Sequence, residues 1–311
     1  MKQIIKAFLV STLVFSTTSC SYFIKEYKPL IKEQAINTTA DMLIGDIMTS
    51  FFEEEDIKLA EDAIPTNLKL IDGMIKASPN NEKLLITASR LYTSYAFGFL
   101  EQTYFSYNED EKAQINNKRA KAFYLRAKNY GMQILTKNPK FKNALTASFD
   151  DFSAVVSNMN KDQIDALFWT AYAWGNLINL SKDDTDAIVD LGRVEIMMKR
   201  ILELDETYYN AGAHLFYMVY YGSRPEMLGG SPEKAKEHYE KAIKITDNKF
   251  LMADFLYAEY YAIQVQDKEL FKSLLNKIIE FDGTTYPQER LTNEIAKKKA
   301  QALIKLEDDL F

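Results

Sequence analysis

Few residue types in this sequence can bind a transition metal or act as a strong nucleophile. The chain has two histidines, His214 and His238, which are 24 positions apart, and a single cysteine, Cys20. A tightly bound zinc ion or a similar metal needs several such ligands held close together. The sequence therefore predicts no metal site, and we expect no cofactor.

Carboxylates are the other groups able to do chemistry, and the chain has 44 of them. Two acidic runs, residues 53–56 and 183–186, lack the glycine and the terminal glutamate of a calcium-binding EF-hand loop. The sequence contains no nucleophile elbow, zinc-protease motif, dinucleotide fingerprint or phosphate loop. No spacing singles out a pair of carboxylates for acid–base catalysis. The sequence predicts that the protein is not an enzyme.

The net charge and the composition exclude some classes of binding partner and indicate what stabilises the fold. The net charge of −6 and the pI of about 5.3 argue against a nucleic-acid partner, which favours a basic face. With one cysteine, no disulfide can form within the chain, so stability must come from a core. The hydrophobic content of 47% is enough for such a core.

The N-terminus has the three parts of a secretory signal. Basic Lys2 and Lys6 precede an apolar run over residues 7–15, and a small polar stretch follows up to Cys20. This arrangement resembles the lipobox of bacterial lipoproteins, although Thr17 stands where leucine is usual. The resemblance implies lipidation of Cys20 and attachment to a membrane through the lipid. The alternative is an ordinary signal cleaved near Ser19.

These features predict three segments. Residues 1–19 form a lipoprotein signal peptide, residues 20–45 a lipidated tether with the start of a first helix, and residues 46–311 a helical domain. We expect the protein in the envelope of a bacterium, facing the periplasm. Ser21, in place of the aspartate that retains some lipoproteins in the inner membrane, favours the outer membrane.

The rest of the chain has the pattern of helices. Only 11 glycines and 7 prolines interrupt it, and no long stretch of alternating apolar residues predicts a strand. Breakers lie where helical hairpins would turn. These turns are at residues 78–81, 138–140, 183–184, 222–232 and 282–283. The predicted fold class is all-α.

One predicted helix carries a repeat-like spacing of small and aromatic residues. Ala235, Tyr239 and Ala242 are spaced as in the second helix of a tetratricopeptide repeat, and Asp247 follows where that repeat turns. The resemblance implies hairpin repeats that form one solenoid or toroidal domain. The alternative is an array of helical hairpins without true repeats. Ser231 is expected to cap this helix, and Pro232 to occupy its first position.

From Asp165 onward, the order of features resembles the T component of TRAP transporters, a family of tetratricopeptide-like periplasmic lipoproteins. The segments that carry the resemblance are residues 166–175, 200–208, 211–216, 224–235, 258–262 and 271–275. It implies a homotrimer that binds the periplasmic solute-binding protein of a TRAP transporter. It also implies a cleft or pore in each subunit for an organic acid or an apolar molecule.

Aromatic and polar-tipped side chains in the same part of the chain are the candidates for a cleft wall. Tyrosine hydroxyls seek partners when buried, and an arginine can hold a carboxylate through two hydrogen bonds. Ordinary core packing at helical spacing is the alternative for each residue. The candidates are Trp169, Tyr172, Trp174, Tyr208, Tyr209, His214, Tyr217, Tyr220 and Arg224.

The leading hypothesis is a lipid-anchored accessory protein of a TRAP-type transport system. Two other hypotheses remain open. A tetratricopeptide scaffold for envelope assembly would bind partners without a small-ligand cleft, and an envelope enzyme would have a deep pocket with clustered carboxylates.

Overall fold

The computed structural model describes residues 17–101, 111–181, 184–282 and 286–311, and every regular element in these ranges is a helix. The predicted all-α class is therefore confirmed for the described residues. The predicted signal peptide, residues 1–19, lies largely outside them, and so does the side chain of Cys20. The boundary expected near residue 45 stays a prediction.

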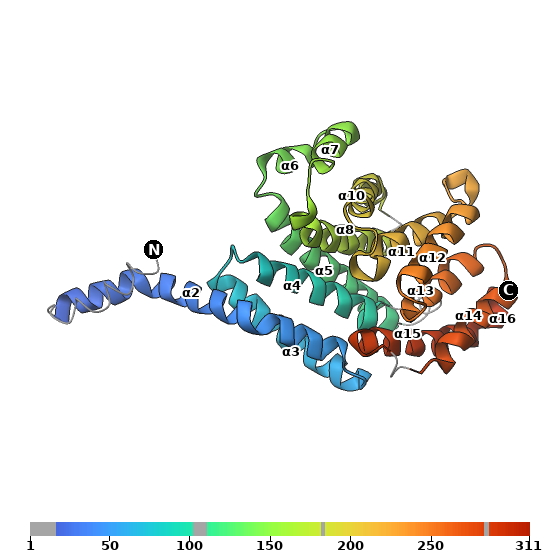
Figure 1. Ribbon diagram of the computed structural model, residues 1–311, viewed down its shortest axis with the longest axis horizontal. Coiled ribbons are helices and arrows are strands. Elements are labelled where there is room, and N and C mark those ends of the chain that lie inside the picture. Colours follow the sequence, from blue (N-terminus) through green and yellow to red (C-terminus); the bar gives the residue numbers. More distant parts are fainter. Residues whose placement is uncertain (1–16, 102–110, 182–183, 283–285) are drawn as a thin grey trace.

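The helices succeed one another along the chain with short connections (Figure 1). The first part contains α2 (Thr17–Phe52), α3 (Ile57–Ala77), α4 (Glu82–Tyr95), the π-helix η1 (Ala96–Leu100), α5 (Glu111–Leu135), α6 (Pro139–Ala144) and α7 (Phe149–Val156). The middle part contains η2 (Lys161–Gln163), α8 (Ile164–Asn179), α9 (Thr185–Val189), α10 (Leu191–Leu204), α11 (Tyr208–Gly222), η3 (Glu226–Leu228) and α12 (Pro232–Ile245). The last part contains α13 (Leu251–Leu256), the π-helix η4 (Tyr257–Ala262), α14 (Lys268–Glu280), η6 (Pro287–Glu289), α15 (Arg290–Leu303), η7 (Ile304–Leu306) and α16 (Glu307–Leu310).

Local sequence signals set several helix starts. The Ser231 side chain accepts from the Lys234 amide, and Pro232 is the first residue of α12, as predicted. Asp184 caps α9 in the same way. The predicted turn at residues 78–81 lies between α3 and α4, where the Asn81 side chain accepts from the backbone of α4.

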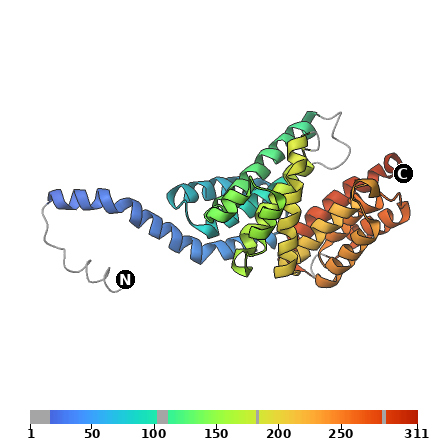
Figure 2. The ribbon, with the colours of Figure 1, turned by 90° about the horizontal axis from the view of Figure 1, so that it is seen from above.

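Helix α2 begins outside the body and ends inside it. Its C-terminal half buries Ala40, Ile44, Met48 and Phe52, spaced by four residues so that they form one stripe. Its N-terminal half projects away from the other helices (Figures 1 and 2). Among the described residues, no helix combines the length and apolar character needed to cross a membrane.

The two ends of the helical body meet. Helix α15 packs against both α2 and α3, and the Arg290 guanidinium lies 3.3 Å from the Glu55 carboxylate in the connection between them. Buried side chains of α2, α3 and α4 form one continuous core with those of α13, α14 and α15. The last helices therefore close the array onto the first ones.

Small residues allow other helices to approach closely. A Cβ atom at Gly131 of α5 would lie 1.9 Å from the Thr170 hydroxyl of α8, so only glycine fits there. A Cβ atom at Gly222 of α11 would lie 3.4 Å from that of Ala235 in α12, the small residue noted in the sequence. These contacts hold α5 against α8 and α11 against α12.

We expect Gly131→Ala to destabilise the protein by about 1–3 kcal/mol, because the added methyl group overpacks the α5–α8 contact. Urea unfolding followed by circular dichroism measures the change. Gly73→Ala on α3 is the matched control, since a Cβ atom there meets nothing within 4 Å. It should leave stability unchanged or raise it by about 0.5–1 kcal/mol through helix propensity. Equal free energies of unfolding for the two variants would contradict the close contact between α5 and α8 at Gly131.

Candidate ligand cavity

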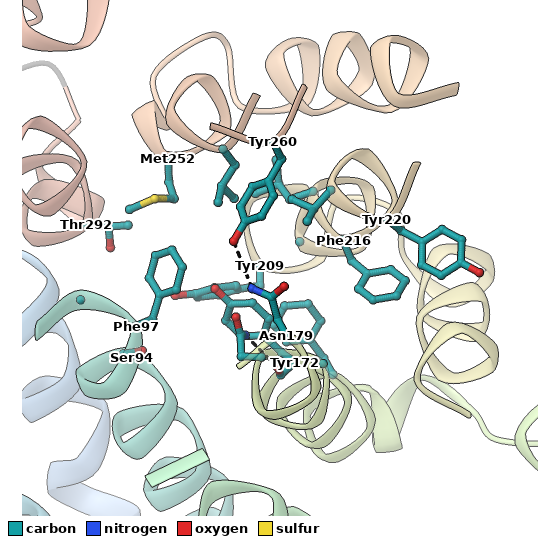
Figure 3. Close-up of a pocket in the computed structure, with 18 of the residues that line it drawn as sticks. Ser94, Phe97, Tyr172, Asn179, Tyr209, Phe216, Tyr220, Met252, Tyr260 and Thr292 are labelled. Atoms are coloured by element: carbon teal, nitrogen blue, oxygen red, sulfur yellow. Dashed lines mark hydrogen bonds between the residues drawn. The ribbon is translucent and has the colours of Figure 1, made fainter. Parts of the chain in front are cut away.

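A cavity of about 680 Å³ lies where the first, middle and last helices meet. Side chains from α4, η1, α8, α11, η4 and α15 surround it (Figure 3). Its volume is within the usual range for small-molecule sites. The lining residues with aromatic rings are Phe51, Phe52, Phe97, Phe99, Phe168, Tyr172, Tyr209, Phe216, Tyr220, Phe250 and Tyr260.

The cavity reaches the surface between α9 and η3. Ile188 and Leu228 line it there and are 46% and 68% exposed. Arg224 and Pro225 line the same end, and the Arg224 guanidinium lies 4.0 Å from the centre of the Tyr220 ring. The opening therefore combines exposed apolar side chains with one cation.

Beyond Arg224, the described lining carries no lysine, histidine, cysteine or carboxylate. Its polar groups are hydroxyls and amides, such as Asn179, whose side-chain nitrogen donates to the Tyr260 hydroxyl at 3.1 Å (Figure 3). Burial raises the pKa of Tyr172 and Tyr209 well above the ordinary value of 10, so both hydroxyls stay neutral. The interior is thus apolar and uncharged, with a few polar points.

Two π-helical segments contribute to the wall. In η1 the Glu101 amide donates to the Ala96 carbonyl, five residues back, at 2.7 Å. This segment supplies Phe97, and η4 supplies Tyr260. Such single π turns are uncommon and occur frequently at functional sites, because the wider turn changes where side chains point. Both π-helices described in this chain line the same cavity.

The start of α11 is a left-handed turn in the cavity wall. Tyr209, Asn210 and Ala211 have φ values of 45°, 53° and 59°. Residues other than glycine enter this region at a cost of about 1–2 kcal/mol each, so surrounding contacts must hold the turn. It brings the Tyr209 ring to 4.5 Å from the Trp169 ring, measured between centroids.

The side chain of Asn210 anchors this turn to the last helices. Its nitrogen donates to the Glu289 carboxyl at 2.8 Å, and its oxygen accepts from the Tyr286 hydroxyl at 2.9 Å. Glu289 also accepts from the Thr292 hydroxyl at 2.9 Å. Burial raises the pKa of the Glu289 carboxyl, and the bonds from Asn210 and Thr292 counteract this rise.

Comparison with known proteins identifies the family of this chain. Residues 53–311 match the family described as the TRAP transporter T-component. The chain belongs to this family. A protein of Treponema pallidum (strain Nichols), described as uncharacterized, is 24% identical over 278 residues, or 86% of this chain and 84% of that protein. Family membership makes this T-component an accessory part of TRAP transporters, which places it in the cell envelope. The family resemblance seen in the sequence is confirmed.

The cavity of this T-component brings together four of the nine residues predicted from the sequence. Tyr172, Tyr209, Tyr220 and Arg224 line it, although Tyr172 and Arg224 are far apart in the sequence. Their role in binding stays a prediction. The sequence reasoning missed the contributions of α2, α4 and α15, because no local pattern indicates which distant helices meet the aromatic ones.

The other five predicted residues lie outside the cavity. Trp169 and Tyr208 line a separate groove between α2, α4 and α8. Trp174 is buried, with the Lys128 ammonium 3.8 Å from its ring centre. The remaining two, His214 and Tyr217, pack at the contact of α11 with α12.

That contact holds an arrangement the sequence did not indicate. The Nδ1 atoms of His214 and His238 are 2.8 Å apart, and the Glu206 carboxylate lies 3.3 Å from Nε2 of His214. His238 also stacks on the Tyr217 ring, with centroids 5.1 Å apart. Within the described ranges, no group of three or more histidine, cysteine and acidic side chains is arranged to hold a metal. The pair is a hydrogen bond between α11 and α12, in which one ring nitrogen donates and the other accepts.

The histidine pair predicts a loss of stability in acid. Burial lowers the pKa of His238 from 6.5 to about 4, and burial also lowers the pKa of His214. Between the folded-state pKa of His238, about 4, and its unfolded value of 6.5, the unfolded chain binds more protons than the folded one. The free energy of unfolding therefore rises as the pH rises through this range. We expect His238→Gln to reduce this dependence, which Tm values at pH 7 and pH 4.5 measure.

Lys236→Gln, on the exposed face of α12, is the control and should keep the wild-type pH dependence. If His238→Gln loses as much Tm as the wild type on acidification, the neutral state of the pair does not contribute to stability.

Proposed function

We propose that this T-component is a lipid-anchored periplasmic protein that binds a small apolar or amphipathic molecule in its cavity and passes it to the solute-binding protein of a TRAP transporter. The observation that carries the proposal is the cavity of about 680 Å³, with its ring-lined, uncharged interior and a surface opening. Apolar walls with a few polar points are typical of small-molecule sites.

The lining favours a ligand with an apolar body. Its aromatic and aliphatic side chains offer no partner for a buried charge, and burying an unpaired charge is costly. Asn179 and Tyr260 offer hydrogen bonds inside the cavity. Arg224 stands at the opening, where it can bind a carboxylate at the end of an otherwise apolar molecule.

Binding and transfer fit this lining better than catalysis. Acid–base or nucleophilic catalysis needs a titratable or nucleophilic group at the reacting atom. The described lining offers tyrosines, Arg224 and the hydroxyls of Ser94, Ser223 and Thr292, with no lining histidine, lysine or carboxylate to activate them. The family is also one of transporter components. The proposal therefore assigns no reaction to the cavity.

The anchor and the assembly are part of the same proposal. Lipidation of Cys20 would tether α2, whose N-terminal half projects from the body (Figure 2). A homotrimer of tetratricopeptide-like subunits in the outer membrane, facing the periplasm, would present the cavity openings to the solute-binding protein. The helical hairpins and the Ala235 contact of α12 support the tetratricopeptide-like part.

Leu215→Trp tests the cavity itself. Leu215 lines the cavity and is 8% exposed, so a larger ring there should fill part of the space. We expect the wild type to bind the neutral probe N-phenyl-1-naphthylamine with a rise in fluorescence, and the variant to lose this binding. Leu125→Trp, at an exposed position of α5, is the matched control and should bind as the wild type does. No binding to the wild type, or equal binding to both variants, would rule out a ligand site in the cavity.

Native mass spectrometry tests the anchor and the partner together. The full chain is captured by affinity from its own cells in mild detergent, beside a Cys20→Ser control. We expect a trimer whose subunits carry an added lipid mass, bound to a periplasmic solute-binding protein. The control should lack the lipid mass. A bait that returns alone or with envelope-assembly proteins would contradict the transport role, and an unmodified Cys20 would contradict the anchor.

A further inference from the structure

A second hollow lies on the outer side of the cavity wall. This groove, of about 540 Å³, lies between α2, α4 and α8, and Tyr208 and Gln288 also line it. Its α4 face is formed by Lys83, Ile86, Thr87 and Arg90, at positions i, i+3, i+4 and i+7 of one helix. Ile44, Gly45, Met48, Thr49 and Phe52 of α2, and Asp165 and Trp169 of α8, form the other sides.

The groove contains two cations, Arg90 and Lys83, that form no direct ion pair. Among the described residues, no carboxylate comes within 4.0 Å of the Arg90 guanidinium or the Lys83 ammonium, although most other arginines of the chain have such a partner. Lys83 donates to the backbone carbonyl of Asp41 at 2.9 Å. The buried carboxyl of Glu289 accepts hydrogen bonds from other residues, and the charge of Arg90 is near enough to lower the pKa of that carboxyl. Neither cation is in a direct ion pair, which leaves N–H donors for a ligand.

Aromatic rings hold the Arg90 guanidinium in place. Its central carbon lies 4.0 Å from the centre of the Phe52 ring, 5.2 Å from that of Tyr209 and 5.4 Å from that of Trp169. Ring faces stabilise a cation but accept no strong hydrogen bond. The Nε atom of Arg90 is buried and has no hydrogen-bond partner. An unsatisfied buried donor is costly, and an arriving acceptor would remove that cost.

We propose that this groove is a second ligand site, specific for a small carboxylic acid with an apolar or aromatic body. Arg90 and Lys83 bind the carboxylate, because a guanidinium offers a planar pair of donors to its two oxygens. Ile44, Met48 and Trp169 contact the apolar body. The carboxylate of the groove, Asp165, accepts a hydrogen bond from the Tyr208 hydroxyl.

This site is distinct from the cavity and goes beyond the proposed function. Phe52 lines both hollows, and Arg90 lines only the groove. The Phe52 and Tyr209 rings therefore separate the charged site from the uncharged interior. Each hollow has its own arginine, Arg90 in the groove and Arg224 at the cavity opening, so substitutions can distinguish them.

Isothermal titration with a matched pair of probes tests the groove. The carboxylate probe is 4-phenylbutyrate, and 4-phenylbutanamide is its uncharged counterpart of similar shape. We expect the wild type to bind the carboxylate at least about tenfold more tightly than the amide, as a charge-assisted pair of hydrogen bonds provides. Arg90→Gln should abolish this preference, and Lys83→Gln should reduce it. Lys140→Gln, at an exposed position on α6, should leave it unchanged.

Two variants at Gly45 test the groove while leaving Arg90 and its contacts with the aromatic rings unchanged. A Cβ atom at Gly45 meets nothing within 4 Å, so a side chain can be added there without a clash. Gly45→Phe should block the groove and abolish 4-phenylbutyrate binding, and Gly45→Ala should retain it. Circular dichroism confirms that each variant is folded.

Arg224→Gln and Leu215→Trp show which hollow is occupied. If both leave 4-phenylbutyrate binding intact, the groove is the site, even where Leu215→Trp has lost the neutral probe. If either of them abolishes the binding and Arg90→Gln does not, the acid binds in the cavity and the groove proposal is wrong. Equal affinity of the wild type for the acid and the amide, or no binding of the acid, also overturns the proposal.

Discussion

The hydrogen bond between the Asn210 amide and the Glu289 carboxyl fixes the geometry on which the cavity depends. Three successive residues with positive φ would cost several kcal/mol without support. The bond joins their turn to the start of α15, and α15 in turn packs against α2 and α3. The first, middle and last helices are thus connected through one buried carboxyl. Its raised pKa is a consequence of holding that position in an apolar wall.

Close contacts between helices occur both around the cavity and within its wall. At Gly131 the helices approach so closely that a Cβ atom would clash, and at Gly222 a Cβ atom would be in ordinary van der Waals contact. In the wall, η1 and η4 interrupt regular helical spacing, and aromatic rings share the lining with Gly98, Gly175 and Gly212. Phe168 lies against Gly212, where even a Cβ atom would come within 2.5 Å. Tight contacts in the wall and around it therefore support the rings that line the cavity.

Local chemistry was readable from the sequence, and the meeting of distant segments was not. The cap at Ser231 and the first position at Pro232 follow from neighbours in the chain, so the start of α12 was predicted correctly. Trp169 and Tyr172 are three residues apart on α8, yet one lines the groove and the other the cavity. Helical periodicity predicts the angle between these two side chains around the helix axis, but it does not predict which other helices each side chain contacts. None of the three residues in the left-handed turn is a glycine, so the sequence did not indicate the turn. The turn depends on the hydrogen bond from Asn210 to Glu289 of η6, which is distant in the sequence.

Charge is distributed so that the wall separates two kinds of environment. The cavity interior is uncharged, since an unpaired charge there would lose its hydration without compensation. Arg90 lies on the outer side of Phe52, where ring faces compensate part of that loss and the Nε atom still has no hydrogen-bond partner. The Phe52 and Tyr209 rings thus serve both hollows, as apolar surface on one side and as support for a cation on the other. Movement of these rings on ligand binding in one hollow would therefore change the fit of the other.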